Sequence, residues 1–161
     1  MDYTTKLAYQ SNYWYNDGLN KANIRDLTGA ITSLKKSLQY NRDNIASRNL
    51  LGLVYFEMGE AVSALGEWVI SQNLRPKKNI ANDYIDMIQN NQARLDGINQ
   101  TIKKYNQALA YCWQDSQDLA VIQLKKVLSN NPKYVRAHQL LALLYMNTEE
   151  WEKARRELEK C

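Results

Sequence analysis

The side chains that could carry catalysis are few and scattered. The 161 residues contain one histidine, His138, and two cysteines, Cys112 and Cys161. A nucleophilic cysteine needs a nearby base, and a zinc site needs several His, Cys or carboxylate ligands together. The sequence has no CxxC motif and no glycine-rich phosphate loop. Acidic pairs such as Glu149-Glu150 stand beside Lys and Arg, as on a solvated helix face. We therefore expect a protein that is not an enzyme and holds no metal ion or cofactor.

The overall composition is that of a globular, mostly helical chain. Hydrophobic residues make up 45% of the sequence and charged residues 24%, with two prolines and six glycines. The formal net charge of +4 leans basic but does not by itself indicate nucleic-acid binding. No apolar run approaches the ~18 residues of a membrane span, and no signal-peptide core is present near the start. We expect a cytoplasmic protein, or the cytoplasmic part of a longer one.

Small residues recur along the chain with a period of 34. The spacing holds from Gly18 to Gly52 and from Ala30 to Ala64, and returns further on between two more pairs, Ala108 to Ala142 and Ala120 to Ala154. Ala64 and Ala120 are separated by one period plus 22 residues. Such a period is typical of helical repeat proteins. The sequence therefore predicts four units with an insertion between the second and third.

With these four repeated spacings, the sequence resembles a tetratricopeptide repeat protein over about 140 positions. The resemblance implies an all-α solenoid, a right-handed superhelix of helix-turn-helix units in which small residues meet across each helix pair. We expect Gly52 to face Ala64, and Gly59 to permit the turn between the two helices. The expected arrangement is one domain over 1–161, with units at about 11–44, 45–78, 101–134 and 135–161 and a helical insertion at 79–100.

Helical periodicity gives nine expected helices. Their ranges are 3–22, 26–40, 44–58, 60–73, 79–90, 92–114, 116–129, 133–147 and 149–160.

The insertion raises two structural questions. Val69 and Ile70 stand where the first and third units have Lys-Lys, and we expect the 79–90 helix to cover them. From Ile88 onward, apolar residues recur every seven positions through Leu109, which is compatible with a coiled-coil seam. The simpler interpretation is that the first helix of the third unit is extended.

The resemblance also implies a binding groove. In this family the first helix of each unit lines a concave face that holds peptide segments. The matching positions here are Tyr15, Leu19, Asn49, Leu53, Phe56, Tyr105, Leu109, Trp113, Gln139, Leu143 and Met146. They lack the cationic clamp that family members use for chaperone carboxylate tails. A Leu- and aromatic-lined face suits an amphipathic helix of a protein partner.

Two other functions remain open. The groove or the extended helix 92–114 could drive homo-oligomerisation instead. Nucleic-acid binding through five basic doublets is a weaker alternative. The doublets form no single stripe and solvated helix faces explain them, so we expect no nucleic-acid partner. They are Lys35-Lys36, Lys77-Lys78, Lys103-Lys104, Lys125-Lys126 and Arg155-Arg156.

Overall fold

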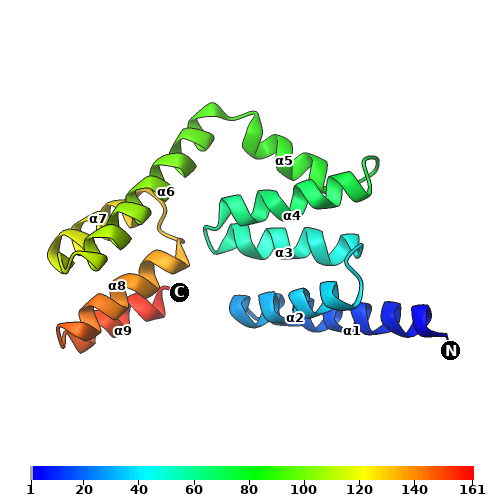
Figure 1. Ribbon diagram of the computed structural model, residues 1–161, viewed down its shortest axis with the longest axis horizontal. Helices are drawn as coiled ribbons and strands as arrows, with labels where there is room; N and C mark the ends of the chain where they lie inside the picture. Colours follow the sequence, from blue (N-terminus) through cyan, green and yellow to red (C-terminus); the bar gives the residue numbers. More distant parts are fainter. Residues whose placement is uncertain (1) are drawn as a thin grey trace. The chain divides into compact units, whose positions relative to one another are not determined.

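A computed structural model describes residues 2–161, and the regular structure in this part of the chain is α-helical, without strands (Figure 1). The predicted fold class is confirmed there as all-α, built of successive helical hairpins. All nine expected helices are present, and their ends fall within two residues of the expected ones. They are α1 (Tyr3–Asn23), α2 (Leu27–Tyr40), α3 (Ile45–Glu57), α4 (Ala61–Leu74), α5 (Ala81–Gln89), α6 (Gln92–Trp113), α7 (Gln117–Asn130), α8 (Val135–Asn147) and α9 (Trp151–Glu159).

Polar side chains mark the beginning of several helices. Asp2, Asp26, Asn44 and Asn91 each accept a hydrogen bond from a backbone N–H in the first turn of the following helix. These N–H groups have no partner within the helix, so a capping oxygen satisfies them and stabilises the helix end. The helix starts are thus set by local sequence.

The turns within the hairpins share one hydrogen-bond pattern. After α3, Glu60 N–H donates to the Tyr55 carbonyl at 2.8 Å and Gly59 N–H donates to the Phe56 carbonyl at 3.0 Å. This pair of bonds is the Schellman motif, which needs a left-handed residue after the helix. Gly59 has φ 78°, which confirms its predicted role in the turn. The other three hairpins close with the same bonds around the left-handed residues Arg25, Asp115 and Glu149.

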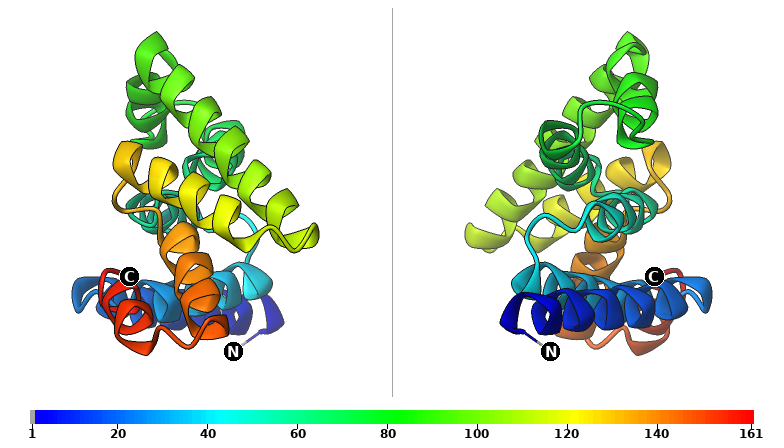
Figure 2. Two further views of the ribbon diagram at one scale, coloured as in Figure 1. Left: turned by 90° about the vertical axis from the view of Figure 1, so that its left-hand side faces the viewer. Right: turned by 90° about the vertical axis from the view of Figure 1, so that its right-hand side faces the viewer.

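The chain divides into two compact units at Asn90 and Asn91. In the first unit, hairpin α1–α2 is followed by hairpin α3–α4, and α5 packs on α4. In the second unit, hairpin α6–α7 is followed by hairpin α8–α9. The helices within each hairpin run antiparallel (Figure 1), and Figure 2 shows hairpins α6–α7 and α8–α9 from another side.

The missing side chain of Gly52 leaves room for Trp68 where α3 and α4 approach each other. A Cβ built on Gly52 would lie 2.2 Å from Nε1 of Trp68 and no more than 2.7 Å from two other indole atoms. Trp68, which the predicted contact of Gly52 with Ala64 did not include, therefore lies against Gly52, and Ala64 is fully buried one turn before Trp68 on α4. The fully buried Trp68 fills that space because its indole N–H donates to the Asn49 carbonyl, at 3.2 Å, on the same turn of α3. In the preceding hairpin, a Cβ built on Gly18 would lie 2.8 Å from Cγ of Leu34 and 3.3 Å from the carbonyl oxygen of Ala30, so the small residues of α1 and α2 do come close there.

Helix α5 packs on α4 without covering the two residues assigned to it. Val69 and Ile70 remain 37% and 41% exposed, so that prediction is wrong. The contact is made instead by Tyr84, whose ring centroid lies 5.0 Å from that of Trp68, and by Asn79, whose amide donates to Ser71 Oγ at 2.9 Å. The reason is that Trp68 and Ser71 lie on another face of α4.

Three equivalent positions of the repeat are buried in some helices and exposed in others. These positions are buried in the three helices that follow an earlier hairpin, and their residues are Ser47, Leu51 and Val54 in α3, Ala81, Ile85 and Ile88 in α5, and Ala137, Leu141 and Leu144 in α8. The equivalent residues of α6 are Lys103, Gln107 and Ala110, and all three are exposed. Helix α5 therefore repeats the burial pattern of α3, whereas α6, the first helix of its unit, leaves these positions exposed.

The heptad pattern does not lie on one helix. Ile88 is fully buried on α5, which ends at Gln89, and the later members of the pattern lie on α6 from Gln92 onward. The seam that starts at Ile88 is therefore interrupted between the two helices. Helix α6 itself is 22 residues long, in agreement with an extended first helix.

Candidate protein-binding surface

The expected groove residues of the first unit are half-buried, and two of them contact other side chains of that unit. Asn49 donates to Asn79 Oδ1 at 2.9 Å, and its carbonyl accepts from the Trp68 indole. The Phe56 ring centroid lies 6.0 Å from that of Trp68. The other expected members, Tyr15, Leu19 and Leu53, are half-buried. These residues stabilise the unit and leave little apolar surface free at these positions.

Tyr105, an expected groove residue of the second unit, belongs to its core. It is 7% exposed, and its ring centroid lies 5.4 Å from that of Tyr134, the residue before α8. The guanidinium of Arg136 lies 5.3 Å from the same ring centroid. Tyr105 therefore packs α6 against the start of α8.

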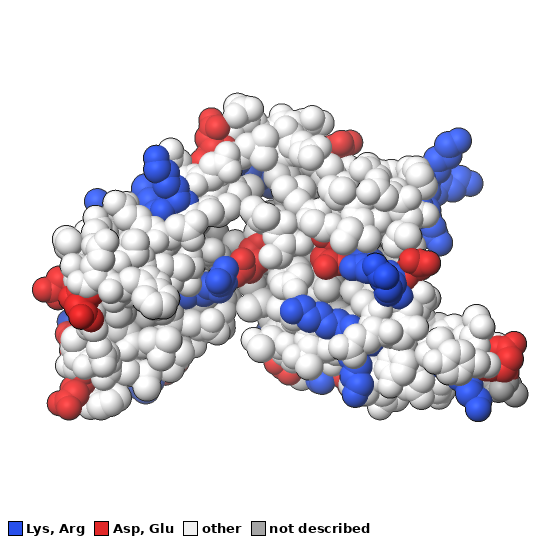
Figure 3. Space-filling view, in the orientation of Figure 1, with Lys and Arg blue, Asp and Glu red and all other residues white. Residues whose placement is uncertain are grey.

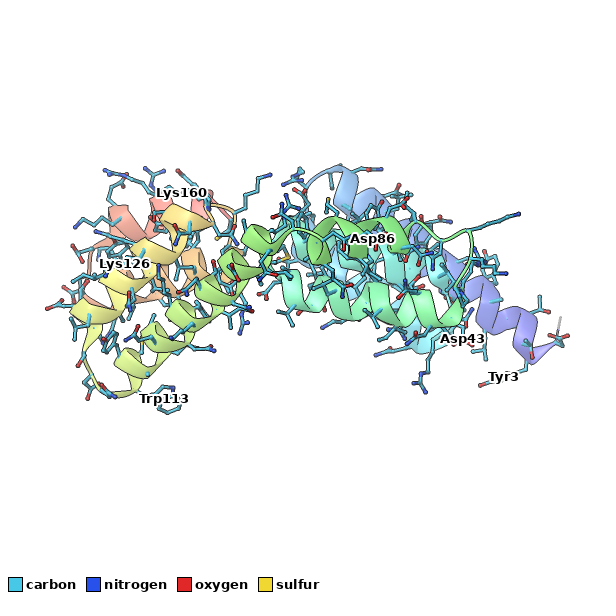
Figure 4. All side chains as sticks on the ribbon, turned by 90° about the horizontal axis from the view of Figure 1, so that it is seen from above. Tyr3, Asp43, Asp86, Trp113, Lys126 and Lys160 are labelled. Carbon is cyan, nitrogen blue, oxygen red and sulfur yellow. The ribbon has the colours of Figure 1, made fainter. Side chains whose placement is uncertain are left out.

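The remaining groove residues of the second unit include the most exposed apolar side chains at these positions. Trp113 is 89% exposed, Leu143 59% and Met146 40%. Trp113 projects away from the end of α6 (Figure 4). Leu109 packs partly buried against the core, and Gln139 is exposed on α8. The structure thus leaves three apolar side chains of the expected set exposed, one at the end of α6 and two on α8, and we call Leu109, Trp113, Leu143 and Met146 the unit 2 surface.

The side chain of His138 is buried and contacts two oxygen atoms of its own unit. The side chain is 4% exposed, with Nδ1 2.7 Å from Glu157 Oε2 and Nε2 2.6 Å from the carbonyl oxygen of Pro132. These contacts link α8 to α9 and to the preceding turn. Both ring nitrogens are thereby engaged within the unit, which leaves neither ready to activate a nucleophile.

Desolvation raises the pKa of both thiols, that of the half-buried Cys112 and that of Cys161, whose residue is otherwise exposed. Burial raises the pKa of Cys112, which is half-buried on α6. Burial also raises the pKa of Cys161, with a further contribution from the negative charge of Glu157. Because the thiolate is the reactive species, raised pKa values disfavour nucleophilic chemistry at both residues.

Residues 2–161 hold neither a cluster of metal ligands nor a helix suited to a membrane. No three His, Cys, Asp or Glu residues there are grouped as metal ligands would be. None of the helices there combines the length and the apolar character needed to cross a membrane.

Sequence reasoning missed Arg136, which lies at the junction of α6 and α8 through its contact with Tyr105. A signal for it was present in the charges. The segments 97–114 and 132–148, which contain most of α6 and all of α8, have Lys and Arg but no Asp or Glu.

The fold and this surface define an all-α protein of repeated helical hairpins with an exposed apolar surface. No family model and no curated protein matches the sequence. Among solved structures, a crystal structure of the MamA protein is similar to this chain, with 23% identity, coverage of 94% of this chain and 89% of that chain, and a TM-score of 0.47. MamA 41-end from Desulfovibrio magneticus RS-1 is also similar, with 14% identity, coverage of 94% and 92%, and a TM-score of 0.47. Likeness at this level assigns neither an activity nor a partner to the chain.

Proposed function

We propose that this chain is a non-enzymatic protein-binding scaffold of tetratricopeptide type, and that its unit 2 surface binds a protein segment through apolar side chains. The observation that carries the proposal is the exposure of Leu143, Met146 and Trp113 at positions where the resembled family binds peptides. Aromatic residues and methionine are enriched at protein interfaces, where their burial supplies most of the binding free energy.

The spacing of these residues suits a helical partner. Leu143 and Met146 are three residues apart on α8, so their side chains lie on one face of that helix. An amphipathic helix presents apolar side chains at the same spacing and can lay them against such a face. Burial of this apolar surface would contribute about 25 cal/mol per Å².

Selection of peptides from a random display library on the purified chain tests the proposal. We expect the selected peptides to carry apolar residues at helical spacing. Their affinity should fall at least about tenfold for the Leu143→Asp/Met146→Asp variant, because a carboxylate in the contact must be desolvated.

A matched control comes from α7 in the same unit. Leu119 and Ile122 are also exposed apolar residues, so Leu119→Asp/Ile122→Asp makes the same chemical change elsewhere. The control variant should retain the selected peptides. Equal loss in both variants, or selected peptides that bind both as well as the wild type, would contradict the assignment of the surface. Leu53→Asp is unsuitable here because Leu53 is half-buried and the change would test stability.

Homo-oligomerisation is a second candidate, and α4 favours it. Four of its apolar residues are exposed, namely Val62, Val69, Ile70 and Leu74. The one charged residue of this helix, Glu67, is paired with Arg48 at 2.8 Å. A second copy could therefore meet this helix without burying an unpaired charge from it.

The repeat itself supplies the variant that tests self-association. Val69→Lys/Ile70→Lys installs the residues that α2 and α7 carry at the same positions, so the fold should tolerate it. If α4 forms the interface, sedimentation at micromolar concentration should show an oligomer for the wild type and a monomer for the variant. A monomeric wild type would exclude this candidate.

A further inference from the structure

Helix α4 differs from the second helices of the other hairpins in its outer face. Four equivalent positions of the repeat are exposed in or directly after α2, α4, α7 and α9. In α4 they hold Val62, Gly66, Val69 and Ile70, which we call the α4 face, and none of the four is charged. The equivalent residues are Thr28, Thr32, Lys35 and Lys36 for α2, Asp118, Ile122, Lys125 and Lys126 for α7, and Glu152, Arg156, Glu159 and Lys160 for α9. Each of these other faces carries at least two charges, which favour contact with water.

Gly66 lies at the centre of the α4 face, and no contact within the described chain accounts for it. A Cβ built on Gly66 meets no atom within 4 Å. The repeat does not require a glycine either, since Thr32, Ile122 and Arg156 stand at the same position. A glycine within a helix lowers its stability relative to alanine, but it lets another backbone approach closely. Gly66 therefore suits a contact with a helix from outside the chain.

The α4 face is symmetric about Gly66. Val62 precedes this residue by one turn and Ile70 follows it by one turn, so large apolar side chains flank the glycine on both sides. If two copies of α4 cross antiparallel at Gly66, Val62 of each copy lies opposite Ile70 of the other. A dimer with a two-fold axis requires such a match, because the same surface must serve both copies.

The charges beyond the end of α4 favour the antiparallel direction. Arg75, Lys77 and Lys78 follow the helix, and all three are exposed. Figure 3 shows Lys and Arg side chains gathered at the right-hand end of the first unit, where Figure 1 places the turn from α4 to α5. A parallel pair would bring both sets of cations to one end, where they repel each other. An antiparallel pair holds them at opposite ends and also opposes the two helix dipoles.

From these observations we infer that two copies of this chain form a closed dimer in which their α4 helices cross antiparallel at Gly66. The contact buries Val62, Val69 and Ile70 of both copies, and apolar burial is its driving force. Glu67 stays paired with Arg48 within each copy. The inference rests on the self-association candidate of the proposed function and adds to it the number of copies, the direction and the centre of the contact. It does not involve the unit 2 surface.

Sedimentation velocity over a concentration series tests the centre of the contact. The wild type should form a dimer, and no larger species, at micromolar concentration. Gly66→Leu should raise the dissociation constant at least about tenfold, because its side chain holds the two backbones apart. The matched control is Gly97→Leu in α6, where a Cβ also meets no atom within 4 Å. The control should leave the dissociation constant unchanged.

Cross-linking tests the direction of the two helices independently of Gly66. The variants are made in a chain that carries Cys112→Ala and Cys161→Ser, and a short bifunctional thiol reagent is added. Val62→Cys/Ile70→Cys should give a covalent dimer, because the two thiols lie opposite each other across the contact. Val62→Cys alone and Ile70→Cys alone should give little. In the antiparallel crossing each of these residues lies about 12 Å along the helix axis from its own copy.

The outcomes separate the inference from self-association in general. A wild type that stays monomeric overturns both. Tighter association of Gly66→Leu would show that apolar area alone drives the contact and would overturn the inference. Species larger than a dimer, or single-cysteine variants that cross-link as well as the double variant, would overturn it too and leave self-association in another arrangement. None of these results bears on peptide binding by the unit 2 surface, which the library selection tests.

Discussion

Nδ1 of His138 lies 2.7 Å from Oε2 of Glu157, and this pair occupies the same repeat positions as Arg48 and Glu67 in the first unit. The equivalence extends to the backbone. Nε2 of His138 lies 2.6 Å from the Pro132 carbonyl, and Nε of Arg48 donates to the Arg42 carbonyl at 3.2 Å. In each case one side chain on a first helix joins the preceding turn to a carboxylate on the second helix.

The His138 contacts should contribute measurably to stability. Glu157→Ala removes the buried carboxylate and leaves Nδ1 without its partner, so we expect a loss of about 1–3 kcal/mol. Glu159→Ala, two residues along the same helix, removes an exposed carboxylate and should cost less than about 1 kcal/mol. Urea denaturation followed by circular dichroism measures both. Similar losses in the two variants would show that the His138 contact contributes little.

Two glycines on neighbouring helices should respond in opposite directions to the same substitution. At Gly52 a Cβ would collide with the indole of Trp68, so Gly52→Ala should destabilise the protein by about 1–3 kcal/mol. At Gly66, in α4, a Cβ meets no atom within 4 Å. Gly66→Ala should therefore stabilise the helix by about 0.5–1 kcal/mol. Thermal denaturation of the two variants gives the signs, and a stabilised Gly52→Ala protein would contradict the contact with Trp68.

The hairpin turns offer a second comparison. Gly59→Ala places a Cβ on a residue with φ 78°, which should cost about 1 kcal/mol. Glu149 occupies the equivalent position in the last hairpin with φ 59°. Glu149→Gly removes the strain but increases the freedom of the unfolded chain, so its net effect should lie between zero and a gain of about 1 kcal/mol. Chemical denaturation checks both changes, and a strongly destabilised Glu149→Gly protein would contradict the common turn geometry.

Asp17 should make part of the stability of the first hairpin dependent on pH. Lys21 Nζ lies 2.8 Å from its carboxylate and Ser33 Oγ donates to it at 2.6 Å, and these hydrogen bonds lower its pKa below the ordinary value of 3.8. The charged form is therefore favoured in the folded state. Its contribution is present above the unfolded pKa and is lost as the pH falls through the lowered folded value.

The Asp17→Asn variant isolates this contribution. The difference in stability between wild type and variant should be largest near neutral pH and should shrink below about pH 4. Urea midpoints measured for both proteins over this pH range provide the check. A difference that stays constant with pH would mean that the carboxylate charge is not involved.

The sequence by itself determined the elements and their order. Gly18, Gly52, Ala108 and Ala142 reveal the repeat because each sits where two helices come close, and Gly59 marks a turn because the backbone there is left-handed. Capping residues and 3.6-residue periodicity act within a few positions of the chain. Helix ends could therefore be predicted to within two residues.

The candidate surface could be predicted only in part. Repeat register selected eleven positions, but it carries no information on what else occupies the space around them. Asn49 and Phe56 contact Asn79 and Trp68, and Tyr105 contacts Tyr134, whereas Leu143 and Met146 stay exposed. These differences arise from side chains up to 30 residues away, which pack according to their size and hydrogen-bonding groups.

Only the tertiary structure shows which side chain lies against Gly52 and which face of α6 is exposed. A 34-residue period aligns Gly52 with Gly18 but does not say that the indole of Trp68, which donates to the Asn49 carbonyl, lies against Gly52. Likewise, Lys103, Gln107 and Ala110 of α6 are exposed at positions that α3 and α8 bury, and the repeat alone does not reveal this difference. Local propensity fixes where a helix forms, while long-range packing alone fixes which of its faces is covered.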